Sequence, residues 1–168
     1  MKRQLKKIVC LALITSMILG QKTLKTTKNV TAKEKKDIKI AIDAGHQARG
    51  NFAMEPVGPG SSTRKAKVAG GATGVASHVP EYKLTLAVSK KLQKELKARG
   101  YKVYMIRTKN NVNISNKKRA QLANKSGADI YIRIHADSSN SRAVTGASGL
   151  YPSKANRYVS KLSAKSKK

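Results

Sequence analysis

The stretch Ile38-Lys-Ile-Ala-Ile-Asp-Ala-Gly-His46 decides how the rest of the chain is interpreted. Its isoleucines recur at every second position, and β-branched residues with a period of two predict a β-strand. The small residues Ala44 and Gly45 follow the apolar run, so His46 is expected just beyond the carboxyl end of the strand. In open α/β sheets this is the edge where ligands bind. His46 is therefore either the end of an ordinary strand or part of a site.

A second predicted strand, Asp129–His135, is built in the same way. Its three isoleucines alternate with Tyr131 and Arg133, and the strand ends on a histidine. If both strands belong to one parallel sheet, their carboxyl ends meet at one edge. His46 and His135 are then expected close together.

Two helices are expected between these strands. The first begins at Pro80, a residue that is tolerated at the start of a helix, and ends before Gly100. Residues recurring every four positions predict one buried stripe on it: Leu84, Val88, Leu92 and Leu96, with Ala87 beside them. The second helix is predicted over Asn116–Lys125, with Ser115 as its N-terminal cap.

The remaining segments complete an alternation of strands and helices. Tyr101–Arg107 is apolar and predicts a strand, whereas Gln47–Val79 is rich in glycine and is expected to be a long functional loop. Gly149–Tyr151 is a possible fourth strand, and Asn156–Ser163 is a possible last helix. The alternation predicts an α/β fold with an open, mostly parallel or mixed twisted sheet and helices on both faces.

The N-terminus has the pattern of a secretory signal peptide. Residues 1–20, or a few more, combine a basic start with the short apolar run Ile8–Gly20, which is too short for an ordinary membrane span. An uncleaved anchor is the alternative. Residues 21–37 are expected to form a flexible basic linker, and residues 38–168 one domain. The expected product is secreted, with no stable membrane insertion after cleavage.

The charge of the chain favours a polyanionic partner. Its formal net charge is +28, from 36 Lys and Arg against 8 Asp and Glu. Nucleic acid, an anionic membrane surface and an acidic cell-wall polymer all fit such a charge. The predicted export, the absence of Trp and the single Phe oppose nucleic acid. An anionic wall polymer remains, although a merely solvated basic surface is the alternative.

The histidines and one glutamate suggest a metal site. Glu81 follows Pro80 in the first turn of the predicted helix, where it would add a carboxylate to His46 and His135. Two imidazoles and one carboxylate, with a further position left to water, form a catalytic zinc arrangement. These three residues are too far apart in the sequence to form a short metal-binding motif. The alternative is that each has an unrelated structural role. His78 is expected to be a loop residue rather than a ligand.

Three further carboxylates are candidates for supporting roles. Asp43 and Asp137 flank the two histidines and either orient the imidazoles from behind or cap the strand ends. Glu55 lies in the glycine-rich loop and either faces a substrate or is solvated.

Three segments in this order resemble the zinc-dependent N-acetylmuramoyl-L-alanine amidases: Ile42–His46, Pro80–Val88 and Ile132–Asp137. Two others are also similar to that family: Glu55–Ser61 and Lys118–Asn124. The resemblance implies a cell-wall hydrolase of the autolysin type, with one zinc ion held by His46, Glu81 and His135. The implied reaction is hydrolysis, in peptidoglycan, of the amide between the lactyl group of N-acetylmuramic acid and L-alanine.

One departure from the family concerns the end of the chain. The family has a catalytic glutamate in a late strand, but Ser138–Lys168 contains neither Asp nor Glu. We therefore expect a domain that is incomplete at its C-terminus, keeps the metal site and lacks a proton-transfer group worth about 10²–10⁴-fold in rate. The alternative function is a non-catalytic or remnant wall-binding module that retains the metal site.

Overall fold

The computed structural model describes residues 33–139, 141 and 143–152. The predicted signal peptide, most of the predicted linker and the possible helix Asn156–Ser163 lie outside the described residues. The elements below belong to the compact unit that begins at Glu34. Its first element is a short 3-10 helix, η1 (Lys35–Asp37), at the end of the predicted linker. Within the described part, no helix is long and apolar enough to cross a membrane.

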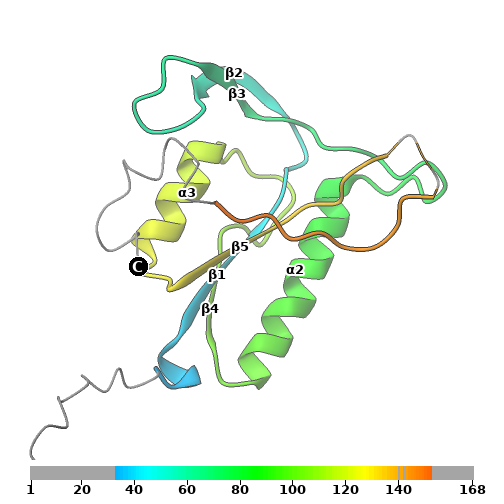
Figure 1. Ribbon diagram of the computed structural model, residues 1–168. Helices are drawn as coiled ribbons and strands as arrows, with labels where there is room; N and C mark the ends of the chain where they lie inside the picture. Colours follow the sequence, from blue (N-terminus) through cyan, green and yellow to red (C-terminus); the bar gives the residue numbers. More distant parts are fainter. Residues whose placement is uncertain (1–32, 140, 142, 153–168) are drawn as a thin grey trace, which may run out of the picture. The chain divides into compact units, whose positions relative to one another are not determined.

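A parallel sheet of three strands forms the centre of this unit (Figure 1). β1 (Lys39–Ala44) is the middle strand, between β4 (Lys102–Met105) and β5 (Ile130–Ile134). Both neighbours run parallel to β1. The three predicted strands, two from apolar alternation and one from apolar composition, are therefore confirmed, and they form one sheet.

The helices α2 (Glu81–Ala98) and α3 (Asn116–Lys125) lie on opposite sides of this sheet (Figure 1). Successive side chains of a strand point to opposite faces. Ala41 of β1 faces α3, where it packs with Ala123, and α2 packs against the other face of β1 and β4. The predicted cap of α3 is also present, because Ser115 Oγ accepts a hydrogen bond from the Lys118 N–H at 3.1 Å.

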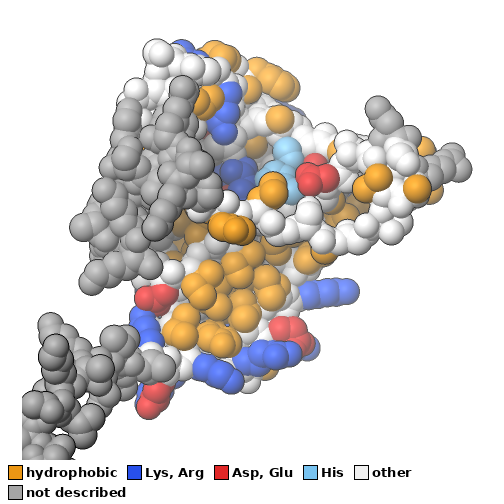
Figure 2. Space-filling model, in the orientation of Figure 1, with side chains coloured by type: hydrophobic (Ala, Val, Ile, Leu, Met, Phe, Trp, Pro, Cys, Tyr) orange, Lys and Arg blue, Asp and Glu red, His pale blue; other side chains and the backbone are white. Residues whose placement is uncertain are grey.

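The predicted buried stripe of α2 is wrong in part. Leu84 and Val88 are 45% and 42% exposed, and the buried side chains of the helix are Glu81, Thr85, Leu86 and Ser89. The helix turns its small polar side chains towards the sheet, because Thr85 Oγ1 donates to the Gly45 carbonyl at 2.8 Å. Hydrophobic side chains consequently gather on the surface over α2 and β5 (Figure 2).

Two further predictions about strands are wrong. The glycine-rich segment expected as a loop contains an antiparallel hairpin, β2 (Asn51–Pro56) with β3 (Arg64–Val68). Most side chains of this hairpin are not buried, so the apolar alternation that marks a strand is missing. No strand forms over Gly149–Tyr151.

Candidate metal centre

The ends of β1 and β5 bring two histidines together. In the parallel register Ala44 is paired with Ile134, so the two strands end level with each other. The Gly45 N–H donates to the Ile134 carbonyl at 2.8 Å, which extends the pairing by one residue. The rings of His46 and His135 then meet edge to face, with centroids 4.7 Å apart.

Glu81 lies between the two imidazoles. Its Oε2 is 3.2 Å from His46 Nε2, and its Oε1 is 3.0 Å from His135 Nδ1. One possible ligand atom from each of the three residues lies within 4.8 Å of the other two. Glu81 is buried, whereas the His135 side chain is 34% exposed. Figure 2 shows a histidine side chain at the surface next to an acidic side chain.

The Glu81 carboxylate is held in place by backbone groups. The N–H groups of Ala136 and Ala72 donate to its two oxygens at 2.8 and 2.9 Å. Burial raises the pKa of this carboxyl, but these two hydrogen bonds, with His46 and His135, outweigh burial and lower the pKa below its ordinary value. Glu81 is therefore an anion at neutral pH, as a metal ligand must be.

The loop between β3 and α2 orients His46. The Ala69 carbonyl lies 2.9 Å from His46 Nδ1, so the other ring nitrogen faces Glu81. A backbone carbonyl on the far nitrogen is the usual partner of a metal-binding histidine. The loop passes so close that a Cβ at Gly71 (φ +84°) would lie 2.9 Å from the Glu81 carboxylate. The sequence analysis did not predict this contact. The Gly70-Gly71 pair is the feature of the sequence that could have indicated it, because the close approach leaves no room for a Cβ at Gly71.

Asp43 acts on His46 through an arginine. Its buried carboxylate accepts hydrogen bonds from Arg119 Nη1 and, at 2.6 Å, from the Tyr131 hydroxyl. Burial and the Asp43 charge raise the pKa of Tyr131, so this hydroxyl keeps its proton. Arg119 in turn donates to the carbonyls of Ala44 and His46, both at 2.9 Å. Asp43 thus supports the backbone of the site.

The other candidate residues have different places. Glu55 is buried and accepts a hydrogen bond from the Lys117 N–H at 2.9 Å, which makes it a cap of α3. Asp137 lines, together with His135, a hollow of about 900 Å³ next to the cluster. His78 is not a member of the cluster.

The three side chains fit a zinc ion by their chemistry. Two imidazoles and an ionised carboxylate are a known donor set of catalytic zinc, and the exposed side of His135 leaves the approach from the hollow open. Fold and donor set together define an α/β protein with a candidate catalytic metal centre at the carboxyl edge of a parallel sheet.

The family model of the N-acetylmuramoyl-L-alanine amidases matches residues 40–168, so the chain belongs to this family. The family is zinc-dependent and acts on peptidoglycan. No curated protein sequence matches the chain.

Two solved structures show the same fold. The N-acetylmuramyl-L-alanine amidase of Mycobacterium smegmatis superposes with a TM-score of 0.58 at 22% identity, over 64% of this chain and 50% of that one. The corresponding enzyme of Mycobacterium abscessus gives 0.56 at 24% identity, over 61% and 49%. The chain thus spans about half the length of the solved structures it matches.

Proposed function

We propose that this chain binds one zinc ion through His46, Glu81 and His135 and hydrolyses the amide between N-acetylmuramic acid and L-alanine in peptidoglycan. The convergence of these three side chains at the sheet edge carries the proposal. When bound, zinc lowers the pKa of a water molecule and polarises a carbonyl group. Membership of the amidase family indicates the substrate class.

The residues of the proposed site have different roles. His46 and Glu81 are fixed by backbone contacts and form the rigid side of the centre. His135 lines the hollow from which a substrate approaches, and Asp137 offers a carboxylate to substrate in the same hollow. Keeping donor atoms on fixed backbone reduces the reorganisation that the reaction requires.

Purified peptidoglycan tests the reaction directly. We expect the zinc-loaded protein to release new L-alanine amino termini, although slowly because residues 138–168 contain no Asp or Glu for proton transfer, and His46→Ala and Glu81→Ala to abolish the release. Amino-terminal labelling of the digest measures it. Zinc binding without any release by the wild-type chain would reject the hydrolase and favour a non-catalytic wall-binding module.

Gly45→Ala is expected to weaken zinc binding. A Cβ at this position would lie 2.6 Å from the Ile134 carbonyl oxygen and 2.7 Å from the His135 ring, so the end of β5 must move. We expect zinc affinity to fall by about tenfold or more, as for the loss of a group that orients a ligand. A chelator competition assay measures it, with Gly70→Ala as control because its Cβ meets no atom within 4 Å. Equal affinities of the two variants would contradict this prediction.

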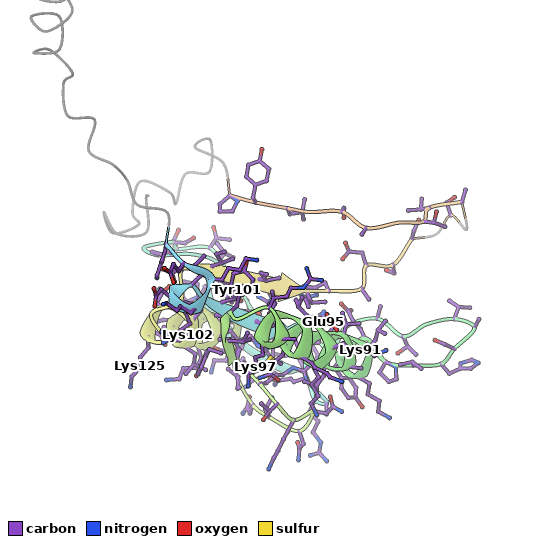
Figure 3. All side chains as sticks on the ribbon, turned by 90° about the horizontal axis from the view of Figure 1, so that it is seen from below. Lys91, Glu95, Lys97, Tyr101, Lys102 and Lys125 are labelled. Carbon is purple, nitrogen blue, oxygen red and sulfur yellow. The ribbon has the colours of Figure 1, made fainter. Side chains whose placement is uncertain are left out.

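The same proposal includes retention on anionic wall polymers. Exposed lysines lie on α2, β4 and α3, and Figure 3 labels four of them: Lys91, Lys97, Lys102 and Lys125. Attraction between exposed charges is screened over about 8 Å at physiological ionic strength. Adsorption to purified cell walls should therefore be strong at low salt and be released at high salt. Binding that does not change with salt would argue against a polymer of this kind.

We also propose that the protein is secreted to the cell wall, with residues 1–20 as a signal peptide, 21–37 as a linker and 38–168 as the amidase domain. The basic start and the short apolar run of the N-terminus support export. Sequencing the N-terminus of the extracellular protein tests it. A start near residue 21 is expected, and an intact Met1 in the cytoplasm would contradict it.

A further inference from the structure

Arg107 follows two residues after the end of β4. Its guanidinium is buried beside the candidate metal centre. The residue is only 2% exposed. Burial and the charge of Arg119 lower the pKa of Arg107 to about 10, against an opposing effect of Asp43, so the side chain is still a cation at neutral pH. Burying a cation costs free energy, and an apolar side chain of similar volume often gives the same or greater stability. The contacts of Arg107 indicate a role other than stability.

One side of the guanidinium holds the end of β1. Nε donates to the Ala44 carbonyl at 2.8 Å, and Nη2 donates to the Gly45 carbonyl at 2.9 Å. The next residue is His46, whose backbone has a φ of +58°. A left-handed conformation is unfavourable for a residue with a Cβ, because the Cβ then lies too close to the following carbonyl oxygen. The hydrogen bonds from Arg107 fix the chain immediately before this strained residue.

The same guanidinium also holds the first turn of α2. Nη2 donates to the Tyr82 carbonyl at 2.8 Å, one residue after Glu81, and lies 3.2 Å from Thr85 Oγ1. Nη1 is anchored to the loop after β4 by the Lys109 carbonyl at 3.1 Å. Arg107 therefore connects the backbone next to His46 with the backbone next to Glu81.

We propose that Arg107 is a positioning residue of the metal centre, which sets the separation of His46 Nε2 and Glu81 Oε2, 3.2 Å in this structure, and thereby the affinity for zinc. This inference rests on the proposed zinc site. Arg107 touches neither donor atom. It acts because a planar guanidinium reaches two elements at once, which the single nitrogen of a lysine cannot do in the same way.

Zinc affinity of the full chain tests this role, measured by competition with a chromophoric chelator. Arg107→Met is expected to bind zinc about 10–100-fold more weakly than wild type, the usual effect of removing a group that orients ligands. Arg107→Lys keeps the charge and is expected to recover part of this loss. Leu86→Ala is the control. Leu86 is buried in α2, the helix that carries Glu81, and its truncation lowers stability without changing the backbone contacts beside either ligand.

Cobalt provides a second measurement. The visible spectrum of Co²⁺ in the site reports ligand geometry, so it should change in both Arg107 variants and stay unchanged in Leu86→Ala. Wild-type affinity in both variants, a loss in Leu86→Ala as large as in Arg107→Met, or failure of both variants to fold would each overturn the proposal. A wild-type chain that binds no zinc would instead reject the metal site itself, and the role of Arg107 with it.

Discussion

Arg119→Met is expected to lower the free energy of unfolding by about 3–5 kcal/mol, the usual cost of removing one partner from a buried ion pair. Arg119 and Asp43 are both fully buried and bonded to each other. Without the arginine, the Asp43 carboxylate would remain inside the protein with the Tyr131 hydroxyl and Arg133 as its nearby partners. Since domains are stable by only about 5–15 kcal/mol, this loss removes a large share of the total. Urea unfolding followed by circular dichroism measures it.

A second arginine variant and a double variant make this test specific. Arg99→Met changes an exposed arginine and should alter stability by less than about 0.5 kcal/mol. Combining Arg119→Met with Asp43→Asn removes both charges, so the double variant should be more stable than the sum of the single losses predicts. Purely additive losses would show that the two charges do not depend on each other.

Glu81→Gln is expected to weaken zinc binding by more than about 100-fold, because even groups that only orient a ligand contribute about 10–100-fold. The substitution removes the negative charge at the centre of the cluster. It also disturbs the anchoring, since the two Glu81 oxygens accept from Ala136 and Ala72, whereas an amide offers one oxygen and a donor nitrogen. One N–H then loses its partner, at a cost of about 1–3 kcal/mol in stability. Isothermal titration with zinc gives the affinity.

His78→Ala is the control, because it removes a histidine that lies outside the cluster. This histidine precedes the same helix but lies outside the group of possible ligands. Its removal should leave zinc affinity within about threefold of wild type, which is less than 1 kcal/mol. A Glu81→Gln chain that binds zinc as tightly as His78→Ala would contradict the assigned role of the carboxylate.

The parts of the fold that the sequence predicts are those with a repeating apolar pattern or a local capping signal. The period of two in Lys39–Ala44 and Ile130–Ile134 identifies two strands, and parallel pairing then places His46 beside His135. Ser115 marks the start of α3 in the same local way. The distances between the strand ends and the helix start could be obtained only from the structure.

The parts that sequence reasoning missed depend on contacts that leave no pattern in the residue types. Arg107 and Arg119 are charged and would ordinarily lie at the surface, yet they are buried because the backbone carbonyls of residues 44–46, from the end of β1 onwards, accept their hydrogen bonds. The Ala69 carbonyl that orients His46 belongs to the backbone, so its residue type carries no signal. Likewise, Leu84 and Val88 predicted the wrong buried face because Glu81 and Thr85 must point to the site.

The proposed metal centre can be observed directly by zinc K-edge absorption of the zinc-loaded full chain, combined with metal analysis after dialysis. We expect one zinc per chain, with two imidazole nitrogens and a carboxylate oxygen among its nearest atoms. The triple variant His46→Ala, Glu81→Ala, His135→Ala should hold none. Zinc retained by the triple variant, or a first shell without two imidazoles in the wild-type chain, would contradict a metal centre at this edge of the sheet.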